Sequence, residues 1–510
     1  MGIPSYYKKL LNELPSLIKR SHPDATIEWL FLDFNCLMYH CLPRAPAYSK
    51  ENHDSWEASF IECIVQYCLK VVRQVNPKMG VYLAIDGVVP MAKMRQQRLR
   101  RFKSVWLKAN GNGNTESWDT NAITPGTVFM QRLHAGLEKM MKGRARWVLS
   151  SSNEPGEGEH KIMNAWRTGQ YQGNVAVYGL DADLIVLSLL GRRHVNGQAW
   201  LFREEVENGV LAHDADGEEL FEWFSIDTLE AWITQGAPDG FLLDYACAMS
   251  VLGNDFLPSS LGLKMRDHGH TELLRILRAL PLPLVYPRTM ELSLEGLQGL
   301  FRLLAAEEPA RIERALYKKQ KNAHHATETG LGEGNWPMSQ KEEEVLVFRR
   351  GPDVHLDRNW QKKYHDHFFA GHEKADIVDS YLYGIQWIWA YYTGRTHEIC
   401  FNWYYPFSLP PLWEWVREVV ALPDFPSTVV LHAHDIKPVQ QLALVLPLES
   451  WHLIPPCPER RFPYIAPQFF PQSFTFESVG KRYFWECEAQ IPLPSMAELQ
   501  ARVSNSSLTS

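Results

Sequence analysis

The feature that most constrains the fold is a set of four short apolar runs in the first half of the chain. They are residues 29–33 (WLFLD), 81–86 (VYLAID), 146–150 (RWVLS) and 174–179 (NVAVYG). Each run is apolar nearly throughout instead of alternating, which is typical of strands buried on both faces of a parallel sheet. Segments of helix length separate them, at 54–74, 91–108, 126–142 and 159–168. This order predicts an α/β fold with a largely parallel, twisted sheet flanked by helices on both faces.

Changes in composition divide the 510 residues into four parts. Residues 1–275 hold the strand and helix pattern, 276–353 form a polar, helical and partly flexible connection, 354–500 are dense in aromatic residues and prolines, and 501–510 form a small polar tail. We expect residues 1–275 to form a core domain and residues 354–500 to pack against it. The longest apolar runs are strand-sized, well short of the roughly 18 residues that a membrane helix needs, so no membrane partner is expected.

Acidic residues stand where the predicted strands end. Asp33 and Asp86 end the first and second runs, Glu157 and Glu159 follow the third, Asp181 and Asp183 follow the fourth, and Asp255 precedes a proline in LLGNDFLP. Because ligands of open α/β sheets bind beyond the carboxyl ends of the strands, these side chains should converge. Carboxylates gathered in one cleft repel one another unless cations neutralise them. We therefore expect Mg²⁺, which prefers oxygen ligands, with Mn²⁺ as a substitute.

The spacing within the acidic pairs indicates the reaction. In extended backbone, side chains two residues apart lie on one side, where Glu157 with Glu159, or Asp181 with Asp183, could share an ion or flank two. Two ions about 4 Å apart stabilise the attacking and leaving oxygens of an in-line phosphodiester displacement. A single Asp after a strand is more commonly a helix N-cap or a turn residue, but five such placements on one edge favour metal-assisted phosphodiester hydrolysis.

Residues 90–103 (PMAKMRQQRLRRFK) form a basic segment in a chain whose net charge is −7. On a helix, Lys93, Gln97, Arg100 and Arg101 share one face. Taken alone, a solvated basic helix is the more common explanation of such a segment. Because this one begins shortly after Asp86, it would lie beside the metal cleft, where forked Arg donors, a Lys charge and a neutral Gln donor suit a terminal phosphate.

Seven motifs in this order resemble the catalytic region of the Xrn-type 5′→3′ exoribonucleases. They are MGIPSYYKKLL, LDFNCLMYH, IDGVVPMAKMRQQRLRRFK, ITPGTVFM, EPGEGEHKIM, YGLDADLIVL and LGNDFLP. Weaker matches to the second conserved segment of that family follow at YLYGIQWIWAYYTG, NWYYPFSLPPL, PVQQLALVLP and SVGKRYFWECEAQIPLP. The resemblance implies a PIN/FEN-like nuclease core, Mg²⁺ dependence and degradation of RNA that carries a 5′-monophosphate.

The resemblance also assigns residues. By matching motifs, the seven acids named above would bind the metal ions and catalyse, and Lys93, Gln97, Arg100 and Arg101 would bind the 5′-phosphate. In the family a Trp and a His hold the first bases between them, and Trp403 is our candidate for the Trp, although core packing would equally explain it. The family's His position is occupied by Tyr39, with His40 next to it, and either could stack on a base.

The predicted function is processive 5′→3′ hydrolysis of single-stranded RNA that carries a 5′-monophosphate, with two metal ions and release of nucleoside 5′-monophosphates. The alternatives are a FEN-like 5′ flap endonuclease acting on DNA and an inactive RNA-binding scaffold. The sequence assigns no protein partner. Scattered cysteines without a CxxC pair fit a reducing compartment, and without a clear lysine-rich nuclear signal we expect a cytoplasmic protein.

Overall fold

The computed structural model describes residues 3, 5–110, 117–207, 210–325, 338, 341–350, 353–419, 421–424 and 433–506. At its centre is a seven-stranded sheet of order β1-β9-β6-β5-β2-β3-β4. In chain order these strands are β1 (Ile18–Lys19), β2 (Trp29–Asp33), β3 (Gly80–Ala84), β4 (Trp147–Ser150), β5 (Val175–Tyr178), β6 (Ala199–Glu204) and β9 (Phe221–Ser225). The five strands from β6 to β4 are parallel, whereas β9 and β1 add antiparallel pairs at one edge. The expected largely parallel sheet is confirmed.

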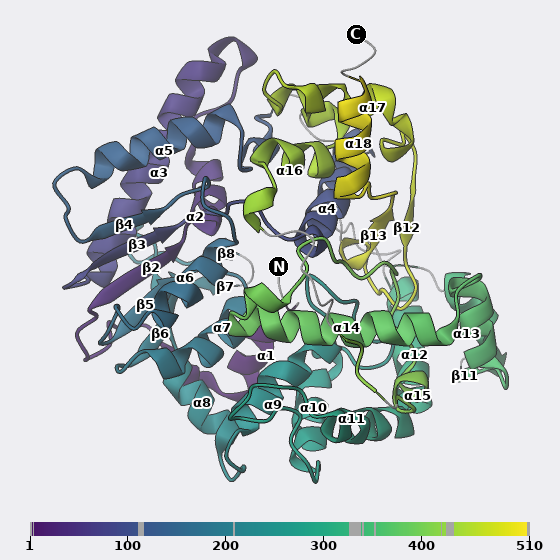
Figure 1. The fold of residues 1–510 in the computed structure, drawn as a ribbon. Helices are drawn as coiled ribbons and strands as arrows, with labels where there is room; N and C mark the ends of the chain where they lie inside the picture. Colours follow the sequence, from purple (N-terminus) through teal and green to yellow (C-terminus); the bar gives the residue numbers. More distant parts are fainter. Residues whose placement is uncertain are drawn as a thin grey trace.

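The sheet is buried on both faces, as the apolar runs predict. Leu30 and Leu32 of β2 belong to one hydrophobic core, and Phe31 between them belongs to the other. The helices next to the sheet are α2 (Phe34–Cys41), α3 (His53–Val75), α5 (Val128–Met141), α6 (Gly158–Arg167), α7 (Asp183–Gly191) and α8 (Ile226–Thr234). Figure 1 shows α3 and α5 on one side of the sheet and α6, α7 and α8 on the other.

A second group of helices follows the sheet. It comprises α9 (Phe241–Ala248), α10 (Gly269–Arg278), α11 (Leu294–Ala306) and α12 (Glu308–His325); the short elements α1 (Tyr6–Glu13), β7 (Val206–Glu207) and β8 (Val210–Leu211) stand earlier in the chain. The segment predicted as a polar, helical connection, 276–353, contains the helices α11 and α12, in which Leu304 and Ile312 are buried. Residues 326–337, 339–340 and 351–352 of that segment lie outside the described part of the chain.

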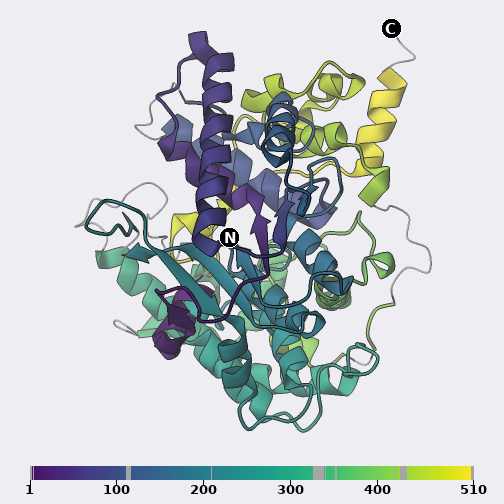
Figure 2. The same cartoon turned by 90° about the vertical axis from the view of Figure 1, so that its left-hand side faces the viewer.

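The remaining elements form the aromatic-rich C-terminal part. They are β10 (Val347–Arg350), β11 (Asp353–Leu356), α13 (Trp360–Phe368), α14 (Lys374–Thr393), α15 (Trp413–Val416), α16 (Pro438–Val445), α17 (Phe462–Ile465), β12 (Thr475–Glu477), β13 (Glu488–Gln490) and α18 (Met496–Ser506). The predicted tail at 501–510 is a helix as far as residue 506, with Val503 buried, and residues 507–510 are not described. In both views α16, α17 and α18, at the yellow-green to yellow end of the colour range, lie at one end of the molecule, and α9 to α11 lie at the other (Figure 1, Figure 2).

The basic helix α4 (Met91–Asn110) joins the core to the C-terminal part. Its Arg98 is fully buried and donates hydrogen bonds to three main-chain carbonyls, those of Leu444, Phe469 and Pro492. This explains why Arg98 lies on the apolar side of the helix: it satisfies carbonyls that would otherwise be buried without a partner. In the described residues we find no helix that combines the length and apolar character needed to span a membrane.

Candidate active site

The carboxyl ends of the parallel strands carry the predicted acids. Asp33 is the last residue of β2, Asp86 lies two residues after β3, Glu157 and Glu159 lie at the start of α6, Asp181 and Asp183 lie at the start of α7, and Asp255 lies in the loop after α9. The close approach of α6 to β2 requires a glycine, because a Cβ on Gly158 would lie 2.8 Å from Oδ1 of Asp33. The main-chain N–H of Gly158 also donates a 2.7 Å hydrogen bond to Oδ1 of Asp86.

The acids lie close enough to act on one another electrostatically. Burial raises the pKa of Asp33 well above its usual range, and the charges of Asp86 and Asp181 raise it further. Burial and the charge of Asp183 likewise raise the pKa of Glu159. Burial, followed by the charge of Asp181, raises the pKa of Asp183 to about 7. The predicted convergence of acids from four separate strand ends is therefore present in the structure.

Lys93 lies among these acids. Its Nζ is 2.5 Å from Oε2 of Glu157 and 2.7 Å from Oδ2 of Asp255. Burial acts to lower the pKa of Lys93, but the two carboxylates outweigh it and raise the pKa well above the usual value. For Asp255, burial acts to raise the pKa and the charge of Lys93 lowers it below the usual range. Lys93 therefore supplies one fixed positive charge to the cluster.

The residues present fit a divalent cation. Glu157, Glu159 and His160 offer ligand atoms that lie within 4.8 Å of one another. Two buried side-chain atoms of the site, Oδ1 of Asp183 and Nε2 of His160, have no hydrogen-bond partner among the residues that the structure describes. Buried polar atoms without partners are costly, and an ion would satisfy them while neutralising the crowded carboxylates. Because oxygen donors dominate, the donor set suits Mg²⁺ or Mn²⁺.

Helix α4 carries the predicted phosphate ligands next to the acids. Arg100 is exposed, whereas Gln97 and Arg101 are buried. Nη2 of Arg101 donates a 2.9 Å hydrogen bond to Oγ1 of Thr124, and its Nη1 is buried and has no hydrogen-bond partner in the described part of the chain. Burial lowers the pKa of Arg101 to about 10, so the group stays charged at neutral pH. Oε1 of Gln97 accepts a hydrogen bond of 3.4 Å from Gln441 of α16.

The predicted stacking residues lie in different surroundings. Tyr39 is 43% exposed, and its phenol lies close enough to Arg101 to act on the pKa of the Arg101 guanidinium. The side chain of His40 is only 8% exposed, with its ring centroid 4.8 Å from that of Tyr67, which argues against a role in base stacking. Trp403 is half-buried, with its ring centroid 5.2 Å from that of Trp387 on α14.

Sequence reasoning missed two residues of the site. The hydroxyl of Tyr391 on α14 donates a 2.8 Å hydrogen bond to Oε1 of Glu157. The Tyr391 ring is also stacked on His160, with centroids 3.8 Å apart. His160 could have been noticed because it follows Glu159 directly in the chain. Tyr391 gives no such signal, since it lies in another part of the sequence and reaches the acids only through folding.

Two family models match the chain. Residues 1–205 match the model described as "XRN 5'-3' exonuclease N-terminus", and residues 302–506 match the model described as "Xrn1 helical domain". Together with the named relatives below, these matches show that the chain belongs to the Xrn-type 5′→3′ exoribonuclease family.

Relatives named as exoribonucleases align with most of the chain. 5'-3' exoribonuclease 1 of Homo sapiens is 26% identical over 96% of this chain and 33% of the human protein. 5'-3' exoribonuclease 2 of Gallus gallus is 23% identical over 98% of this chain and 69% of the chicken protein. 5'-3' exoribonuclease 1 of Schizosaccharomyces pombe is 30% identical over 52% of this chain and 23% of the yeast protein. The chain thus spans a third or less of the length of these human and yeast relatives.

Among solved structures, "The catalytic core of Rad2 in complex with DNA substrate (complex III)" aligns with a TM-score of 0.31. The two chains are 10% identical, and the alignment covers 72% of this chain and 86% of the other. A likeness at that level supports no inference about substrate.

Proposed function

We propose that this chain degrades single-stranded RNA in the 5′→3′ direction from a 5′-monophosphate and releases nucleoside 5′-monophosphates. The observation that carries the proposal is the convergence of acids such as Asp33, Glu159 and Asp183 beside the cationic face of α4. Its family membership and the names of the relatives support the same reaction class.

The residues of α4 are proposed to recognise the 5′ end. Arg100 and Arg101 present forked donors that match the oxygens of a phosphate. The buried Nη1 of Arg101 has no hydrogen-bond partner among the described residues, so it can donate a hydrogen bond to a phosphate oxygen. Gln97 can add a neutral hydrogen bond. A pocket built for one phosphate group would exclude a triphosphate or a cap.

The acids are proposed to hold two divalent ions, Mg²⁺ or Mn²⁺, through the seven carboxylates, with His160 as a further donor. When bound, such ions stabilise the charge on the attacking and leaving oxygens of the scissile phosphate. Lys93 orients Glu157 and Asp255 by contacting both carboxylates. In the reaction, water attacks the first internal phosphorus, the bond to the 3′ oxygen of the first nucleotide breaks, and that oxygen takes up a proton.

Processivity would follow from the products. Each cleavage leaves a new 5′-monophosphate on the remaining RNA, which is the group that Arg100 and Arg101 would recognise. Tyr39 and Trp403 are the proposed stacking residues, and stacking does not read sequence because every base presents a π-face, at about 1–3 kcal/mol per base. We also propose, from composition alone, that the protein acts in the cytoplasm.

The substrate class is tested by incubating the protein and Mg²⁺ with 5′-phosphorylated single-stranded RNA or with a flap DNA of matched length. We expect mononucleotides from the RNA and little cleavage of the DNA. Cleavage of the flap at its base would indicate the FEN-like alternative, and binding of RNA without any product would indicate a scaffold.

A further inference from the structure

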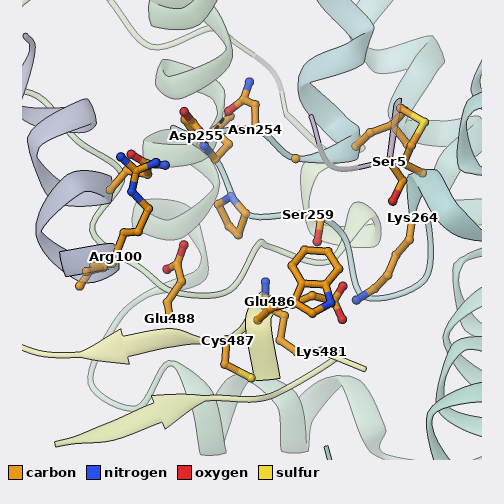
Figure 3. Close-up of a pocket in the computed structure, with 18 of the residues that line it drawn as sticks. Ser5, Arg100, Asn254, Asp255, Ser259, Lys264, Lys481, Glu486, Cys487 and Glu488 are labelled. Carbon is orange, nitrogen blue, oxygen red and sulfur yellow. Dashed lines mark hydrogen bonds between the residues drawn. The ribbon is translucent and has the colours of Figure 1, made fainter. Parts of the chain in front are cut away.

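A cavity lies next to the candidate active site, between α4 and the C-terminal segment (Figure 3). Its walls come from five places that are distant in the sequence: Ser5, α4, the loop that carries Asp255, residues 264–266 and residues 481–488. Arg100 and Asp255 line this cavity and also belong to the proposed catalytic machinery. The cavity is therefore continuous with the site at its phosphate-binding end.

The lining of the cavity has a surplus of unpaired positive charge. Two of its acidic residues already form ion pairs. Glu486 pairs with Arg266, with a nitrogen-to-oxygen distance of 2.8 Å, and Glu488 pairs with Arg95 at 3.4 Å. In contrast, neither Arg100 nor Lys481 forms an ion pair with any residue that the structure describes. A concave surface with uncompensated cations concentrates anions.

The cavity also offers an aromatic surface. Trp485 lines it, and the guanidinium of Arg266 lies 5.0 Å from the centroid of the Trp485 ring. Asn254 and Ser259 add polar side chains to the opposite wall, formed by the loop that carries Asp255 (Figure 3). An indole next to free cations is the combination that binds a nucleotide, because the base stacks while the phosphate is neutralised.

We propose that this cavity receives the departing nucleoside 5′-monophosphate. The inference rests on the proposed function and follows from the polarity of that reaction. The nucleotide that is cut off keeps the 5′-phosphate held by Arg100, whereas the scissile phosphate stays on the remaining RNA. A cationic cavity on the Arg100 side of the site is thus on the product side. Lys481 binds the phosphate of the departing nucleotide, and its base stacks on Trp485. The phosphate pocket at Arg100 is then free to bind the new 5′ end.

The test is equilibrium binding of AMP to the full chain, measured by calorimetry in the presence of a metal chelator, so that no turnover is needed. We expect Lys481→Glu and Trp485→Ala each to weaken AMP binding at least tenfold. Lys139→Glu on α5, an exposed lysine outside the cavity, should leave it unchanged. Adenosine, which lacks the phosphate, should bind more weakly than AMP to the unsubstituted protein.

A second experiment measures how AMP inhibits RNA degradation. The inhibition constant for added AMP should rise at least tenfold in Lys481→Glu, whereas Lys139→Glu should change neither that constant nor the initial rate on RNA by more than twofold. Unchanged AMP affinity and inhibition in folded Lys481→Glu and Trp485→Ala would overturn the proposal, as would the absence of AMP binding at millimolar concentration. Trp485→Leu, which keeps apolar bulk but offers no ring for stacking, serves if Trp485→Ala does not fold. If the chain binds AMP in this manner but degrades no RNA, the proposed function fails and the nucleotide site stands.

Discussion

The hydroxyl of Tyr391 donates a hydrogen bond to Glu157, a residue 234 positions earlier in the chain. The bond connects α14, in the part that matches the helical-domain model, to α6, in the part that matches the exonuclease model. The same tyrosine ring stacks on His160. The second conserved part of the chain therefore orients the acid cluster directly, in addition to covering the core.

Replacing Tyr391 with Phe should lower kcat about tenfold and leave KM for RNA nearly unchanged, because groups that orient metal ligands contribute 10- to 100-fold to activity. The ring and its stacking on His160 are kept, so the protein should stay folded. Tyr392→Phe is the matched control, since the buried hydroxyl of Tyr392 forms no hydrogen bond with any described residue. Equal kcat values for the two variants, measured by mononucleotide release, would show that the Tyr391 hydroxyl has no such role.

The double substitution Arg100→Ala with Arg101→Ala should remove the preference for 5′-monophosphate over 5′-hydroxyl RNA. Both guanidinium groups are proposed phosphate donors, and charge-assisted bidentate contacts are among the strongest in recognition. The measurement is the ratio of kcat/KM values for the two substrates. Lys108→Ala, an exposed position near the end of the same helix, is the control and should keep the ratio. If the double variant keeps the ratio of the unsubstituted protein, the 5′-phosphate is not bound by these residues of α4.

Charge crowding predicts a pH-dependent effect of Asp183→Asn in the metal-free protein. Because the pKa of Asp183 is raised to about 7, the folded state binds this proton more tightly than the unfolded chain does. Its contribution to stability is therefore present at low pH and lost as the pH rises from about 4 to about 7. The Asn variant, which cannot ionise, should have a Tm a few degrees above that of the wild type at pH 8 in chelator.

That difference in Tm should vanish as the pH falls below about 4, where Asp183 becomes protonated in both the folded and the unfolded wild type. Added Mg²⁺ should raise the Tm of the wild type more than that of the variant, because the variant has lost one carboxylate ligand. If the Asn variant is less stable than the wild type at pH 8 in chelator, the carboxylates near Asp183 do not destabilise the metal-free protein by repulsion.

Arg98→Met should destabilise the protein by about 3 kcal/mol or more, because it leaves buried carbonyls of the C-terminal segment without their charged donor. Arg95→Met on the same helix is the control: it removes one partly exposed ion pair with Glu488 and should cost about 0–1 kcal/mol. The free energies of unfolding come from urea titration. If the two variants lower the free energy of unfolding by similar amounts, the hydrogen bonds of Arg98 are not the main interaction between α4 and the C-terminal part.

Much of the core could be predicted from local sequence. The strand at 29–33 is observed with the predicted bounds, and Asp33 lies at its carboxyl end. The rule that parallel strands bring their carboxyl ends to one edge was enough to gather the acids. Spacing along α4 was enough to align Lys93 with Gln97, since a helix has a fixed period.

The remaining features depend on contacts between distant residues. The two-residue strand β1 pairs with β9 although it carries no apolar run of its own. The packing of α12 could not be predicted because polar residues dominate its local composition. Its buried apolar residues, Ile312 and Leu316, stand among the buried charged residues Glu308, Arg311 and Lys319. Lys93 was assigned to a phosphate, yet in the folded chain it contacts Glu157 and Asp255, which no spacing rule anticipates.

The most direct test of the account compares RNAs with 5′-monophosphate, 5′-triphosphate and 5′-hydroxyl ends, each with Mg²⁺ and with chelator, and scores released mononucleotides. We expect rapid release from the monophosphate RNA in Mg²⁺, at least tenfold slower release from the other two, and none in chelator. Release that continues in chelator, or equal rates for the three 5′ ends, would contradict a metal-dependent nuclease that selects its substrate through the cationic face of α4.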